Sequence, residues 1–216
     1  MENIEKDITR CSQALGFDSY KITHLLKLFS DLDKKDKRTS EHCICVARIM
    51  RQASELSCSL GLDPSIMELG GIYHDIGKLR APASVLRKER GFDGLDMAVI
   101  RNHPINGWKL LEGTNYFLMG LAERHHTLQD EPYPSTYYLH DIHRILSIHG
   151  REENAKAFDR MLVMLVLSDH TEAAHRNTGF IWKDMAVTKG NVSEYLSTRF
   201  PKYAGIIEQF HSAGIF

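Results

Sequence analysis

The feature that most constrains this fold is a helical repeat of apolar side chains. Apolar residues recur every three to four positions through most of the chain, and the strict alternation typical of strands is scarce. Six segments show the repeat most clearly, and we expect each to be helical: Ile22–Phe29, Val46–Leu60, Met97–Leu111, Ile142–Ile148, Phe158–Leu167 and Ile206–Phe210. The sequence therefore predicts an all-α fold.

Turn and capping residues predict where some helices begin and end. Gly61 suits the left-handed residue that follows a helix, and Asp63 before Pro64 reads as an N-cap with proline in the first turn. This pattern predicts two antiparallel helices. The charged run 31–38 is expected to be a solvated loop, and the proline-containing run 127–136 an irregular loop.

Charge and targeting signals narrow the function class. The 27 basic and 28 acidic side chains nearly cancel, which disfavours a large nucleic-acid surface or an anionic membrane as partner. The first residues lack the apolar core of a signal peptide, and no apolar run reaches the roughly 18 residues that a membrane span requires. The 4 cysteines fit neither a disulfide framework nor a zinc ribbon. We expect a cytoplasmic protein that acts on a small molecule.

Histidine is the residue that points to chemistry. The chain has 12 histidines, about twice the number expected for its length. His74 and Asp75 stand in the run GGIYHDIGK, where small residues allow close helix packing. Neighbouring side chains on a helix diverge by about 100°, so both can reach one metal only near a helix end. About one His-Asp pair is expected by chance, and His140-Asp141 is a second; His74-Asp75 differs because Gly77 and Lys78 follow it.

The other histidines and one aspartate complete an ordered set along the chain. They are His42, His103 before Pro104, the doublet His125-His126, and Asp169 after a long apolar run. This set resembles the HD superfamily of metal-dependent phosphohydrolases. The stretches HDIGK at 74–78, Pro82 with VLRK at 85–88, and His103-Pro104 followed by Gly107 are most similar to its HD-GYP branch. The resemblance covers roughly residues 40–175.

The resemblance implies a domain organisation and a ligand set. It implies an HD-type helical bundle at 39–176 as the catalytic core, with helical extensions at 1–38 and 177–216. It implies that Asp75 bridges two metal ions. One ion is completed by His42, His74 and Asp169, and the other by His103, His125 and His126.

The residue types support this metal chemistry independently. Imidazole and carboxylate suit divalent iron, manganese, nickel, cobalt or zinc, whereas calcium prefers oxygen ligands alone. Seven groups exceed what one ion needs, so we expect two ions, most plausibly iron. A pair about 3.5–4 Å apart can activate water and bind phosphate oxygens. Lys78, one turn after Asp75, is placed to neutralise charge on a phosphate oxygen, so Asp75 and Lys78 are the expected catalytic residues.

The expected activity is hydrolysis of a phosphoester bond in a nucleotide, with a cyclic dinucleotide as the first candidate substrate. Two alternatives stay open: a mixed-valent di-iron oxygenase of the same superfamily, and a non-catalytic regulatory HD module. The sequence does not decide the oligomeric state.

The chain departs from the HD-GYP pattern in two places. Pro132 replaces the glycine of the Gly-Tyr-Pro motif before Tyr133 and Pro134, which alters the loop because proline cannot adopt a positive φ. Arg38 stands where some members of the branch have a glutamate for a third metal, so two metals are expected. The interval between His126 and Asp169 is also longer than the pattern. Its histidines, His140, His143 and His149, are expected to be hydrogen-bonded or surface residues and not a second metal site.

Overall fold

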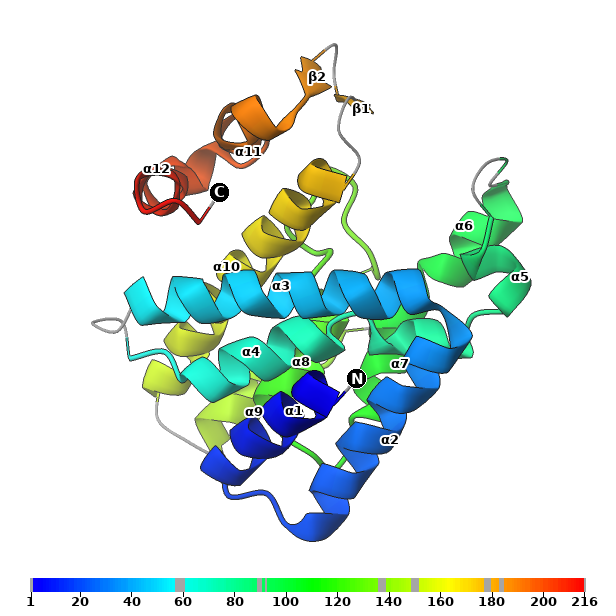
Figure 1. Ribbon diagram of the computed structural model, residues 1–216. Helices are drawn as coiled ribbons and strands as arrows, with labels where there is room; N and C mark the ends of the chain where they lie inside the picture. The colour runs from blue at the N-terminus through cyan, green and yellow to red at the C-terminus, as the bar shows by residue number, and fades with distance from the viewer. Residues whose placement is uncertain are drawn as a thin grey trace.

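The computed structural model describes residues 2–56, 61–88, 91, 93–135, 139–148, 152–176, 180–182 and 185–215. The all-α class is confirmed within this part of the chain (Figure 1). Its helices are α1 (Glu2–Ala14), α2 (Ser19–Lys35), α3 (Lys37–Leu56), α4 (Pro64–Tyr73), α5 (Ala83–Leu86), α6 (Gly94–Ile100), α7 (His103–Leu110), α8 (Tyr116–Arg124), α9 (Ile142–Ile148), α10 (Glu152–Arg176), α11 (Val192–Arg199) and α12 (Ala204–Ser212). Short 3₁₀ turns are η2 (Ile76–Arg80), η4 (Lys189–Asn191) and η5 (Pro201–Tyr203). No helix in these ranges is long and apolar enough to cross a membrane.

The long helix α3 lies across the middle of the molecule and organises its neighbours (Figure 1). It packs against α2, α4 and α10, while α8 packs on α4 and α7, and α7 packs on η2. Gly71 on α4 permits the close approach to α3, because a Cβ there would lie 2.5 Å from the Cα of Ala47 on α3. The small residues before His74 therefore bring α3 and α4 together, as the sequence predicts.

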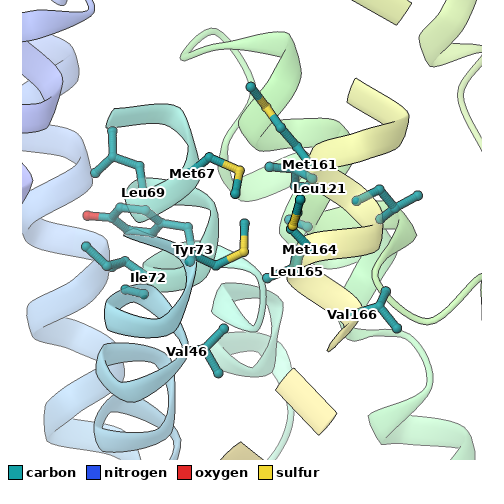
Figure 2. Close-up of a cluster of buried hydrophobic side chains, with 14 of the residues drawn as sticks. Val46, Met67, Leu69, Ile72, Tyr73, Leu121, Met161, Met164, Leu165 and Val166 are labelled. Carbon is teal, nitrogen blue, oxygen red and sulfur yellow. The ribbon is translucent and has the colours of Figure 1, made fainter. Parts of the chain in front are cut away.

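The core lies between α4 and α10 (Figure 2). The side chains shown there are buried, and they come from α3, α4, α8 and α10: Val46, Met67, Leu69, Ile72, Tyr73, Leu121, Met161, Met164, Leu165 and Val166. Helix α10 is buried on successive positions from Met161 to Ser168, which a helix requires when other elements cover it on several sides. Asp169 follows this buried stretch and is fixed in place by it.

Capping follows the sequence prediction at the start of α4. The Asp63 side chain accepts hydrogen bonds from the backbone N–H groups of Ser65 and Ile66, and Gly61 has a φ of +65°. The region 127–135 contains no helix or strand, as expected of an irregular loop.

Two expectations about elements are wrong. The run 31–38 is not a loop: α2 continues to Lys35, α3 begins at Lys37, and Asp36 alone separates them. Lysine is a good helix former, and Leu32 is fully buried within this charged run, so burial of one face extends the helix.

The predicted helix Met97–Leu111 is divided into α6 and α7. Pro104 has no N–H for a helical bond to Ile100.

The predicted C-terminal helical extension contains an antiparallel hairpin, β1 (Phe180–Trp182) with β2 (Met185–Val187), before α11. Three-residue strands are too short to give a periodic signal.

Candidate metal centre

Asp75 lies at the centre of the cluster, and its two carboxylate oxygens face different partners. Oδ1 lies 3.1 Å from His103 Nε2 and 3.7 Å from His125 Nε2. Oδ2 lies 3.5 Å from His74 Nε2 and 3.7 Å from His42 Nε2. Asp75 directly follows the end of α4, at a position where adjacent His74 and Asp75 side chains can both reach the same centre.

Helix ends orient two of these rings. His74 is the C-cap of α4, and its Nδ1 lies 2.8 Å from the carbonyl oxygen of Gly71. His125 is the C-cap of α8, and its Nδ1 lies 3.0 Å from the carbonyl oxygen of Ala122. The last carbonyls of a helix have no helical partner, so each accepts the Nδ1–H of the histidine three residues later. A ring that donates from Nδ1 presents the lone pair of Nε2 to the centre.

A proline produces the same arrangement at His103. Because Pro104 cannot donate to the carbonyl oxygen of Ile100, that oxygen is free, and His103 Nδ1 lies 2.7 Å from it. The break between α6 and α7 is therefore what orients His103.

His42 is oriented by a carboxylate instead of a helix end. It lies in the first turns of α3, and its Nδ1 hydrogen-bonds Glu172 of α10. Its Nε2 lies 3.0 Å from Asp169 Oδ1. Glu172 was missed by sequence reasoning; the signal that could have found it is its place one turn after Asp169 on the same helix.

The donor set fits cations at the centre. Oriented in this way, the Nε2 lone pairs of His103 and His125 face each other at 3.0 Å, and the Nε2 atoms of His42 and His74 lie 3.2 Å apart. Asp75 Oδ1 is buried without a hydrogen-bond partner. Facing lone pairs and a buried unpaired oxygen are costly unless a positive charge lies between them. The ligand atoms fall into two groups that could each hold a metal ion, and Asp75 belongs to both: His42, His74 and Asp75, and Asp75, His103, His125 and His126.

The protonation states of His74, His103 and His125 suit metal binding. Burial lowers the pKa values of His74, His103 and His125, which keeps these imidazoles neutral. Burial would raise the pKa of Asp75, but Lys78 and the surrounding histidines hold it well below its usual value. At His42 burial would lower the pKa, yet Asp169 and Glu172 raise it to about 9. The two carboxylates thus favour the protonated form of His42.

Comparison with known proteins agrees with this geometry. Residues 39–136 match the family model described as HD domain. This segment is therefore similar to the HD domain family. The matched segment includes six of the seven clustered residues, and Asp169 of α10 lies beyond it.

Two kinds of relative extend the match. A cyclic di-GMP phosphodiesterase of Pseudomonas aeruginosa, PA4108, is 34% identical over 83 residues, which are 37% of this chain and 19% of the relative. The chain thus spans about a fifth of that relative's length. The crystal structure of the HD domain of the phosphodiesterase PgpH from L. monocytogenes has a TM-score of 0.52 and 19% identity, covering 88% of this chain and 86% of that one. The same domain in complex with cyclic-di-AMP has a TM-score of 0.51 and 20% identity, with the same coverage. These structures show that the fold is shared.

The loop after α8 covers one side of the HD-domain cluster. Tyr133 stacks on His126, with ring centroids 4.3 Å apart, and the Arg101 guanidinium lies 5.5 Å from the Tyr133 ring centroid. The Gln129 amide lies 2.6 Å from His126 Nδ1. The loop therefore fixes His126 and limits the open side of the centre.

The remaining histidines of the insertion contact other groups. His140 stacks on Trp108 and lies 2.6 Å from the buried carboxylate of Glu123. His143 lies 2.8 Å from Asp159 on the surface. Neither belongs to the metal-binding groups among the described residues, and His149 lies outside the residues that the structure describes.

Lys78 contacts the central aspartate directly. Its Nζ lies 2.5 Å from Asp75 Oδ2, and its side chain is 22% exposed. Burial would lower the pKa of Lys78, but Asp75 raises it, so the ammonium stays charged beside the centre.

Proposed function

We propose that this protein is a metal-dependent phosphodiesterase that hydrolyses a phosphoester bond in a nucleotide, with a cyclic dinucleotide as the first substrate to test. The observation that carries this proposal is that the two carboxylate oxygens of Asp75 face different histidines. Oδ1 faces His103 and His125, and Oδ2 faces His42 and His74. One carboxylate with an imidazole pair on each side suits two adjacent ions.

We assign His42, His74 and Asp169 to one ion and His103, His125 and His126 to the other, with Asp75 shared. Neutral imidazoles with carboxylates suit divalent iron, and manganese, nickel, cobalt and zinc are the alternatives. When bound, two such ions supply the Lewis acidity that activates water and binds phosphate oxygens.

Residues of this protein position the imidazoles and supply a positive charge for the reaction. The Nδ1 hydrogen bonds hold the imidazoles before substrate arrives, so no reorganisation is needed. Lys78 places an ammonium where negative charge grows on a phosphate oxygen. The relatives named as cyclic-dinucleotide proteins support a nucleotide substrate, and the HD core at 39–176 with its two extensions is the proposed folding unit.

The test combines metal analysis with a substrate screen on anaerobically purified protein. We expect two ions per chain and cleavage of bis(p-nitrophenyl) phosphate and of a cyclic dinucleotide to its linear form. Asp75→Ala should lose most of both metals and the activity, whereas His143→Ala, the matched control outside the cluster, should keep both. Full metal content in Asp75→Ala would reject the ligand assignment, and oxygen consumption without phosphodiester cleavage would reject the hydrolytic function.

A further inference from the structure

A cavity adjoins the proposed metal centre. Its volume is about 240 Å³, and it is lined by Asp36, Arg38, Thr39, Lys78, Leu86, Lys88, Ile100 and Arg176. Two of its lining residues form ion pairs with residues of the centre. Lys78 pairs with Asp75 at 2.5 Å, and Arg176 pairs with Glu172 at 3.5 Å. The cavity therefore lies next to the centre.

The lining is dominated by positive charge. It contains the four basic residues Arg38, Lys78, Lys88 and Arg176, and one carboxylate, Asp36. The Asp36 carboxylate accepts a hydrogen bond from Thr39 at 2.6 Å. Among the described residues, no carboxylate lies within the 4.0 Å ion-pair distance of the Arg38 guanidinium, although Arg38 is exposed to the cavity.

The other three cations have partners that lie outside the lining. Lys88 pairs with Asp96, Lys78 with Asp75 and Arg176 with Glu172. Two of these carboxylates, Asp75 and Glu172, also face the histidine cluster. Their negative charge is thus shared with the centre, and the cavity keeps a surplus of hydrogen-bond donors.

Tertiary structure gathers these cations from distant parts of the chain. Arg38 lies in the first turn of α3, Lys78 in η2, Lys88 after α5, and Arg176 at the end of α10. Lys78, Lys88 and Arg176 each have a carboxylate partner, whereas Arg38 has none within ion-pair distance among the described residues. An anion bound in the cavity would therefore complement the charge of Arg38.

We propose that this cavity binds a second, non-scissile phosphate of the substrate, so that a nucleotide with two phosphate groups is preferred over a single phosphodiester. The cavity is smaller than the roughly 300–1,000 Å³ of sites for whole drug-sized ligands, which fits one phosphate group. Arginine and lysine donors are the groups that recognise phosphate. This inference rests on the proposed function, because Lys78 is shared by the cavity and the centre.

The test compares two substrates on metal-loaded protein. The kcat/KM for a cyclic dinucleotide, which has two phosphates, is divided by that for bis(p-nitrophenyl) phosphate, which has one. Arg38→Gln and Arg176→Gln should each lower this ratio roughly tenfold, the effect of losing one charge-assisted hydrogen bond. Arg38→Lys should restore part of it. Arg48→Gln, an exposed arginine on α3 outside the cavity, is the matched control and should leave the ratio as in the wild type.

An unchanged ratio in both Arg38→Gln and Arg176→Gln would overturn the inference while leaving the proposed function intact. Should the wild type cleave no phosphodiester, the proposed function fails, and calorimetric binding of inorganic pyrophosphate then decides about the cavity. Weaker binding in Arg38→Gln than in Arg48→Gln would support an anion subsite, and equal binding in the two variants would refute it.

Discussion

At the scale of single residues, the centre is prepared by hydrogen bonds on the side of each imidazole that faces away from it. His74, His103 and His125 use backbone carbonyls, and His42 uses the carboxylate of Glu172. Such partners fix the ring orientation and increase the basicity of the ligand. Glu172 differs from the carbonyls because it can be changed by mutation without altering the backbone.

Glu172→Gln should therefore weaken metal binding without unfolding the protein. Loss of a hydrogen-bonding partner of a ligand typically costs about 10–100-fold in metal affinity, and we expect this effect at the ion held by His42. Competition with a chromogenic chelator measures it. Glu153→Gln, an exposed position on the same helix, is the control. Equal affinities in the two variants would show that Glu172 does not orient the ligand.

Lys78→Met should act on the rate and not on the metals. The substitution keeps the aliphatic stem and removes the charge, and the loss of one well-placed electrostatic group typically costs about 10²–10³ in rate. We expect kcat for a phosphodiester to fall by that factor while metal content stays at the wild-type level. Unchanged turnover would remove Lys78 from the site, and loss of metal would make its role structural.

At the scale of elements, the close approach of η2 to α7 brings Asp75 to His103. Gly77 makes it possible: a Cβ there would lie 1.8 Å from the carbonyl oxygen of His103 and 2.5 Å from the backbone nitrogen of Gly107. Both contacts are with backbone, so a side chain at position 77 would have to separate the two elements.

Gly77→Ala should consequently lower both stability and metal content. Overpacking of this kind costs about 1–3 kcal/mol, and separation of η2 from α7 would move Asp75 away from His103. Thermal unfolding and metal analysis on the same preparation measure the two effects. Gly205→Ala is the matched control, because a Cβ at that position in α12 meets nothing within 4 Å and alanine is the better helix former. Wild-type metal content in Gly77→Ala would contradict this view of the interface.

At the scale of the whole molecule, the clustered residues come from segments that are distant in the chain. They extend from His42 in α3 to Asp169 in α10, with the others at the ends of α4 and α8 and at the start of α7. An unfolded chain cannot hold these groups together, so metal binding is coupled to folding.

Removal of metal should lower the unfolding temperature. A ligand that binds only the folded state at about 1,000 times its Kd contributes roughly 4 kcal/mol, which for a chain of this size is on the order of 10 °C. Differential scanning fluorimetry with and without a chelator measures the shift. Asp75→Ala should show almost no response to the chelator. A wild-type Tm that does not respond would mean that metal binding and folding are independent.

The fold class, one helix start and the presence of a metal centre could be predicted from the sequence. The helical repeat predicts the fold class, Asp63-Pro64 predicts the start of α4, and the order of histidines with the flanking glycines predicts a metal centre. The helical repeat and the N-cap depend on residues within a few positions of each other, whereas the order of histidines was interpreted through its resemblance to a family. We expected His140 and His143 to be hydrogen-bonded or surface residues, and they contact Glu123 and Asp159 respectively.

What only the tertiary structure decided is how distant segments meet. The charged run 31–38 is helical because Leu32 is buried by other elements, and no local signal reports that burial. Glu172 and Arg38 look like ordinary surface charges in the sequence, yet α10 brings one to His42 and α3 brings the other to a basic cavity. Sequence determined which chemical groups this protein has, because side-chain chemistry and helix periodicity are local. Tertiary packing decided which of those groups share one site, because that depends on contacts between residues that lie as far apart in the chain as His42 and Glu172.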